Sequence, residues 1–138
     1  MAFFDTNVLV YMYDRRETHK QATAAELFHR HFPRKLGAIS TQVLQEFFVA
    51  ATRKTGLLTA SEAAKEVAVY AAMDTLVVVQ PYHVLDAIQL HLRMRIAFWD
   101  GLIVAAARAA GASILFTEDL SHGRVYDGVR AENPFLVP

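Results

Sequence analysis

The chain opens with the stretch Ala2-Phe3-Phe4-Asp5-Thr6-Asn7-Val8-Leu9-Val10-Tyr11, in which two apolar runs flank an acidic residue. The first run predicts a buried strand over Ala2–Phe4, and the second predicts a helix over Val8–Tyr13. A strand that passes at once into a helix is the start of a strand–helix unit. The stretch therefore indicates an α/β fold with a parallel sheet.

The rest of the chain repeats this alternation of short apolar runs and helical patterns. Further strands are predicted at Ala38–Ser40, Leu76–Gln80, Ser113–Thr117 and Phe135–Val137. Further helices are predicted over residues 18–32, 41–54, 60–73, 83–95 and 100–110. Thr59 or Ser61 is expected to cap the helix over 60–73, with Glu62 in its first turn. No repeat or linker divides the sequence, so we expect a single domain over residues 1–138.

The composition excludes several classes of protein. Hydrophobic residues make up 54% of the 138 residues, which is typical of a folded globular chain and not of a disordered one. The absence of cysteine excludes disulfides, thiolate zinc sites and cysteine nucleophiles, and it fits a cytoplasmic location. The N-terminus does not resemble a signal peptide, and no apolar run reaches the roughly 18 residues that span a membrane.

The formal charge is zero, with 14 basic and 14 acidic residues. This balance argues against a protein that grips nucleic acid over a broad basic surface. Divalent cations bound by carboxylates would nevertheless make the loaded protein cationic. Overall charge therefore decides neither for nor against a nucleic-acid partner.

Four acidic residues fall where a site is expected. Asp5 follows the first strand and Asp119 comes shortly after the strand at 113–117, and in open parallel sheets ligands bind at the carboxyl ends of the strands. Asp100 begins a predicted helix, and Glu46 lies about one turn inside another. The three aspartates also suit helix N-caps, an interpretation that stays open for each of them.

Glu46 is harder to explain as a surface residue. Its neighbours three and four positions away carry no positive charge, and it borders an apolar stripe of its helix. A pair with Arg53, two turns further on, is a strained alternative. A carboxylate beside the core is costly unless something neutralises it, and several such acids together repel one another. A hard divalent cation removes this penalty and accepts oxygen ligands.

Four segments resemble the motifs of PIN domains. They are Phe4-Asp5-Thr6-Asn7-Val8-Leu9-Val10, then Gln45-Glu46-Phe47, then Trp99-Asp100-Gly101-Leu102-Ile103-Val104-Ala105-Ala106-Ala107, and Thr117-Glu118-Asp119-Leu120. The tail, with Gly128-Val129-Arg130 and Asn133-Pro134-Phe135, is similar to the end of VapC-type ribonucleases, the toxins of toxin–antitoxin pairs. The resemblance runs from residue 3 to about residue 135. Trp99 departs from what some relatives carry, which would affect substrate fit.

The resemblance implies a three-layer α/β/α sandwich around a short parallel β-sheet. It also implies an endoribonuclease that binds Mg²⁺ or Mn²⁺, cleaves RNA, forms a homodimer and has a cognate antitoxin. The metal ligands carried over are Asp5, Glu46, Asp100 and Asp119, with Glu118 in reserve for the fourth. Thr6, Asn7 and Thr117 have hydroxyl or amide groups suited to hydrogen-bonding these ligands, although Thr6 and Asn7 equally suit a turn.

Three alternatives remain at this point. One is a PIN nuclease that processes cellular RNA and has no antitoxin. Another is a module of the same fold that binds RNA or protein without catalysis, which predicts no metal binding. The third is a phosphotransferase with an aspartyl nucleophile, whose usual Asp-x-Asp start is broken here by Asn7.

Overall fold

The computed structural model describes residues 1–53 and 56–137. Its strands are β1 (Ala2–Phe4), β2 (Gly37–Ser40), β3 (Leu76–Val77), β4 (Ile114–Phe116), β5 (Val125–Tyr126) and β6 (Val129–Glu132). Its helices are α1 (Thr6–Tyr11), α2 (Thr18–His31), the short 3₁₀ helix η1 (Phe32–Arg34), α3 (Thr41–Arg53), α4 (Ala60–Ala71), α5 (Pro81–Met94) and α6 (Phe98–Ala109).

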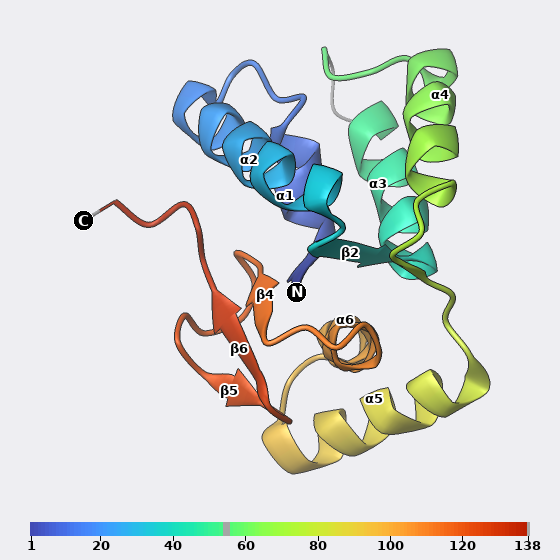
Figure 1. The fold of residues 1–138 in the computed structure, drawn as a ribbon, viewed down its shortest axis with the longest axis vertical. Coiled ribbons are helices and arrows are strands. Elements are labelled where there is room, and N and C mark those ends of the chain that lie inside the picture. The colour runs from blue at the N-terminus through green and yellow to red at the C-terminus, as the bar shows by residue number, and fades with distance from the viewer. Residues whose placement is uncertain (54–55, 138) are drawn as a thin grey trace.

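The strands form one sheet in the order β3-β2-β1-β4-β6-β5, parallel except for the pair β5–β6. Helices α1 to α4 cover one side of this sheet, and α5 and α6 cover the other (Figure 1). The predicted α/β/α fold around a parallel sheet is confirmed, and the antiparallel pair β5–β6 is an addition to it.

The strand order reverses at β1. From β1 the chain builds β2 and β3 on one side, and it later adds β4 and β6 on the other. Such a reversal leaves a crevice at the carboxyl ends of the two central strands. Here those strands are β1 and β4, which pair from Ala2 with Ile114 to Phe4 with Phe116. Asp5 comes directly after Phe4, so the fold opens its crevice beside the first predicted site residue.

The core lies on both faces of this central pair. Phe3 and Phe4 of β1 are fully buried, and so are Val8 and Leu9 of α1. Helix α6 is buried along its whole middle part, Gly101–Ala107. Burial of the apolar residues of these strands and helices is the main source of stability for a domain of this size. No helix in residues 1–53 or 56–137 has the length and apolar character needed to cross a membrane.

One predicted strand is shorter in the structure than expected, and another does not form. The expected strand Leu76–Gln80 is shortened to Leu76–Val77. Its partner β2 ends at Ser40, where the chain turns into α3, so residues after Val77 have no neighbouring strand to pair with. The Val79 amide instead donates to the hydroxyl of Thr41, at 3.1 Å. The expected strand Phe135–Val137 does not form, and the Phe135 ring packs against Tyr11.

The last two strands, β5 and β6, were not predicted. They form a hairpin whose turn residues, Asp127 and Gly128, both have positive φ. An Asp-Gly pair between two apolar positions is a strong hairpin signal and could have revealed these strands. The other predicted elements occur within two residues of their expected ends. The expected end of one helix at residue 54 lies outside the described residues.

Candidate active site

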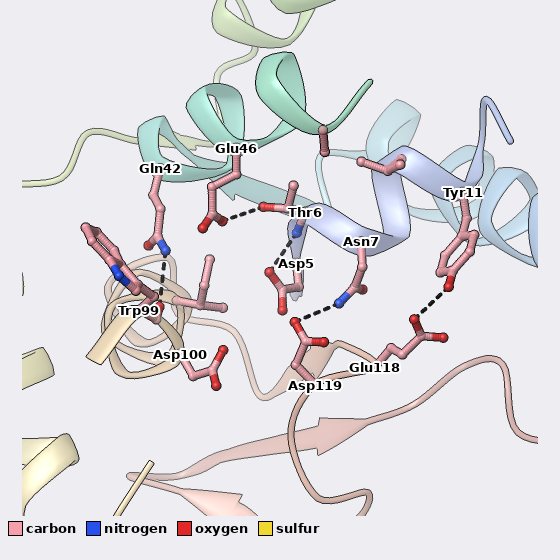
Figure 2. A pocket seen from close by; sticks show the side chains of 13 residues that line it. Asp5, Thr6, Asn7, Tyr11, Gln42, Glu46, Trp99, Asp100, Glu118 and Asp119 are labelled. Atoms are coloured by element: carbon pink, nitrogen blue, oxygen red, sulfur yellow. Dashed lines mark hydrogen bonds between the residues drawn. The ribbon is translucent and has the colours of Figure 1, made fainter. Parts of the chain in front are cut away.

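The four predicted acids line one pocket of about 300 Å³. Asp5 follows β1, Glu46 lies on α3, Asp100 lies in the first turn of α6, and Asp119 follows β4. Figure 2 shows their side chains around a common space, with Thr6 and Asn7 between Glu46 and Asp119. Segments far apart in the sequence thus converge where the strand order reverses.

Asp5 is the most enclosed of the four acids, with a relative exposure of 5%. One carboxylate oxygen accepts the Thr6 amide at 2.7 Å, which makes Asp5 the N-cap of α1. The other oxygen accepts the hydroxyl of Thr117, also at 2.7 Å. The cap interpretation is therefore correct for Asp5, and the same carboxylate also faces the pocket.

The other two residues expected to support the ligands also contact acids. The Thr6 hydroxyl donates to Glu46 at 2.8 Å, and the Asn7 amide donates to Asp119 at 3.1 Å. All of these donors are uncharged, so they orient the carboxylates without neutralising them. The structure includes no ion pair between Glu46 and Arg53, although it describes both residues.

The cap interpretation is wrong for the other two aspartates. Helix α6 begins at Phe98 with Ala97 as its N-cap, so Asp100 lies inside the first turn and not before the helix. Asp119 lies in a bend of the chain, and no helix follows it within residues 120–137. Gly101 allows α6 to lie close against α5, because a Cβ there would come within 2.9 Å of the Ala87 carbonyl oxygen. This close packing fixes the start of α6 and with it the place of Asp100.

Burial and neighbouring charges raise the pKa of two of these carboxylates, Asp5 and Asp100. Burial raises the pKa of Asp5 from 3.8 to about 7; hydrogen bonds from Thr117 and Thr6 oppose this shift, and the charges of Asp119 and Glu46 add to it. The pKa of Asp100 is also raised, first by burial and then by the charges of Asp119 and Glu46. No lysine or arginine is among the described residues that line the pocket. The site thus concentrates negative charge that no basic side chain in its lining offsets.

A comparison with protein-family models matches residues 2–128 to the PIN domain. The chain belongs to the PIN-domain family. A comparison with curated proteins found no match.

Solved structures share the fold at low sequence identity. VapC20 of Mycobacterium tuberculosis, described as a sarcin-ricin loop cleaving toxin, is 20% identical with a TM-score of 0.66, covering 86% of this chain and 90% of that one. A toxin–antitoxin complex from Klebsiella pneumoniae is 18% identical with a TM-score of 0.66, covering 99% and 100%. DNA-bound VapBC from Salmonella typhimurium is 16% identical with a TM-score of 0.67, covering 96% and 97%. At these identities the likeness establishes the PIN fold.

The donor set of this PIN domain fits a hard divalent cation by its chemistry. Every charged group that lines the pocket is a carboxylate, and the side-chain oxygen of Asn7 is buried without a hydrogen bond from the described residues. In the side-chain positions of this structure, however, no three acidic or histidine residues among those described form a group compact enough to hold a metal ion. The pocket thus has the right ligand types, and they do not form a closed ligand set.

Glu118 and Asp119 have different surroundings in the PIN domain. The Glu118 carboxylate accepts the Tyr11 hydroxyl at 2.7 Å and the Lys20 ammonium at 2.8 Å. The Asp119 carboxylate accepts the side-chain amide of Asn7 and forms no ion pair with the described residues. A carboxylate already paired with an ammonium is the poorer candidate for a metal ligand, so these contacts favour Asp119.

Sequence reasoning missed Gln42, which lies one helical turn before Glu46 and lines the same pocket. Its amide donates to the Trp99 carbonyl at 3.1 Å and so connects α3 to the start of α6. The spacing of four residues from Glu46 places both side chains on one helix face and could have revealed it.

Proposed function

We propose that this chain is a divalent-metal-dependent endoribonuclease. The observation that carries the proposal is the convergence of four acids from distant segments on one pocket, whose described lining residues include no lysine or arginine. Because the pKa of Asp5 is raised to about 7, its ionised form destabilises the fold. A divalent cation bound in the pocket would remove this cost. Membership of the PIN family supports the same function.

Asp5 would be the central metal ligand, with Asp100 and Asp119 completing the set, and Glu46 would bind a second ion or orient the attacking water. When bound, Mg²⁺ or Mn²⁺ would supply a water of lowered pKa as the nucleophile and stabilise the departing oxygen. Thr117, Thr6 and Asn7 would hold these carboxylates in place through the hydrogen bonds described above. No serine, cysteine or histidine nucleophile is needed in this proposal.

The direct test is cleavage of single-stranded RNA by the purified protein. We expect cleavage within the chain in the presence of Mg²⁺ or Mn²⁺, and none after treatment with EDTA. A small chromogenic phosphate monoester should not be hydrolysed under the same conditions. Cleavage that persists in EDTA would contradict the proposed metal dependence, whereas hydrolysis of the monoester alone would favour a phosphatase.

We further propose that the nuclease is the cytoplasmic toxin of a toxin–antitoxin pair. Structures similar to this chain include toxin–antitoxin complexes, and the similarity extends over nearly the full length of both chains. A short open reading frame beside the gene, encoding a small DNA-binding protein that forms a complex with this chain, would support the toxin assignment. Its absence, together with cleavage of cellular RNA during normal growth, would favour an RNA-processing nuclease.

A homodimer is also proposed, with α5 as its interface. One face of α5 is buried, and the opposite face exposes a stripe of apolar side chains, with relative exposures of 60% for Tyr82, 63% for Leu85 and 65% for Leu92. Their spacing of three and seven residues keeps them on one side of the helix. Apolar stripes of this kind on otherwise folded chains commonly form interfaces.

Sedimentation of the wild-type protein should then show a dimer at micromolar concentration. The double substitution Leu85→Glu and Leu92→Glu should shift it to a monomer, because each introduces a charge that the interface would have to bury. Val69→Glu on α4, at a residue 59% exposed, is the matched control and should leave the dimer intact. A monomeric wild-type protein would contradict the homodimer.

A further inference from the structure

A second pocket of about 450 Å³ adjoins the acidic one and shares four lining residues with it, Gln42, Glu46, Ala50 and Trp99. Its remaining lining residues, Gln45, Val49 and Arg53, come from the same face of α3. We refer to this second pocket as the Trp99 groove. Because the two spaces meet at shared side chains, a polymer held in the acidic pocket would continue into the Trp99 groove.

Trp99 gives the groove an aromatic surface. Trp99 is 62% exposed, although tryptophan has one of the largest apolar surfaces to leave in contact with water. Figure 2 shows Trp99 beside Gln42 at one end of the acidic pocket, with Tyr11 and Glu118 at the other. The Gln42 amide donates to the backbone carbonyl of Trp99 and so fixes the position of the backbone that carries the ring.

Two further groups in the groove, the side-chain oxygen of Gln42 and the guanidinium of Arg53, can bind a polar ligand. Gln42 is only 4% exposed, and its side-chain oxygen accepts no hydrogen bond from the described residues. A buried acceptor of this kind is costly until a donor reaches it. Arg53 is exposed, forms no ion pair with the residues that the structure describes, and is the one basic residue among those that line either pocket.

An aromatic ring, a buried acceptor and an exposed arginine match the groups that a nucleotide presents. We propose that the Trp99 groove binds a nucleotide of single-stranded RNA next to the cleaved bond. The base stacks on Trp99, an N–H or O–H of the nucleotide donates to Gln42, and Arg53 pairs with a phosphate. Stacking on an exposed ring is the common mode of binding single strands. This inference rests on the proposed nuclease function and adds the residues that position the substrate.

Trp99 is the only tryptophan in the sequence, so its fluorescence reports on the groove directly. Hexa-adenylate and hexa-uridylate are titrated in Mg²⁺ into an Asp100→Asn variant, which prevents turnover. Saturable quenching of the emission is expected, at the same RNA concentration at which the anisotropy of a labelled oligonucleotide saturates. RNA binding without quenching would place the strand elsewhere and overturn the inference.

Variants in the otherwise native chain test the effect on cleavage. Trp99→Ala should lower kcat/KM for RNA roughly 5- to 150-fold, the usual effect of losing one stacked base, and mainly through KM. Trp99→Phe should keep most of the activity. Arg53→Gln should reduce the slope of log affinity against log salt by about 0.7, the value for one phosphate contact of a single strand. Val69→Ala on α4, at an apolar residue that is similarly exposed (59%) and lines neither pocket, is the matched control and should change nothing.

The outcomes separate this inference from the proposed function. RNA cleavage with an unchanged kcat/KM in Trp99→Ala would leave the nuclease intact and overturn the nucleotide site. A wild-type protein that neither binds nor cleaves RNA would overturn both. Quenching by an antitoxin segment and not by RNA would assign the groove to a protein partner and overturn the inference.

Discussion

Asp5→Asn is expected to lower RNA cleavage by at least about a thousandfold and to leave the chain folded. A metal ion stabilises the transition state by several kcal/mol, and each 1.36 kcal/mol corresponds to about a tenfold change in rate. The asparagine removes a negative charge from the centre of the proposed ligand set. It keeps an oxygen that can cap α1, so the Thr6 amide retains its acceptor. The loss should therefore appear in the rate of cleavage and not in the secondary structure.

The measurement is single-turnover cleavage of a labelled RNA in Mg²⁺, with circular dichroism of the same samples. The matched control is Asp86→Asn, the same substitution at an exposed residue in the first turns of α5. It should leave the rate unchanged. An Asp5→Asn protein that still cleaves RNA at a comparable rate would remove the basis of the proposed mechanism.

The sequence predicted the central part of the fold well. The strands β1, β2 and β4 and the helices between them have strong local signals. One of these is the cap of α4, where the structure shows Thr59 in a capping box with Glu62. Predictions failed at the edges of the sheet. Whether Val78 and Val79 extend a strand depends on the length of β2, which local residue preferences do not contain. Val78 is accordingly 54% exposed, despite its β-branched side chain.

The candidate site was predicted as a set of residues but not as a set of contacts. Position after a strand or near the start of a helix identified the four acids, and the structure brings all four to one pocket. It also shows that Thr117 holds Asp5 and that Lys20 holds Glu118, pairs separated by 112 and 98 residues in the sequence. Contacts over such distances follow from the packing of β1 and α2 beside the chain after β4, which sequence periodicity does not reveal.

The metal-free protein is expected to lose stability as the pH rises from about 4 to about 7. The pKa of Asp5 is raised from 3.8 to about 7, so folding favours its neutral form. That contribution is complete below pH 4, diminishes as the unfolded chain gives up its proton, and is lost once the pH passes the folded pKa. The shift of about three units corresponds to at most about 4 kcal/mol. Thermal denaturation in EDTA between pH 4 and pH 8 measures this loss.

Asp5→Asn isolates this contribution, because the variant cannot ionise at position 5. Its stability in EDTA should equal that of the wild type near pH 4 and exceed it at pH 8, whereas Asp86→Asn should follow the wild type throughout. Mg²⁺ at a hundredfold excess over its dissociation constant should restore about 2.7 kcal/mol to the wild type at pH 8. The gain should be smaller at pH 5, where a proton competes for the same carboxylate. Equal pH dependence of the wild type and Asp5→Asn would show that the pKa of Asp5 is not raised in the folded protein. An equal response of both proteins to Mg²⁺ would show that Asp5 is not a metal ligand.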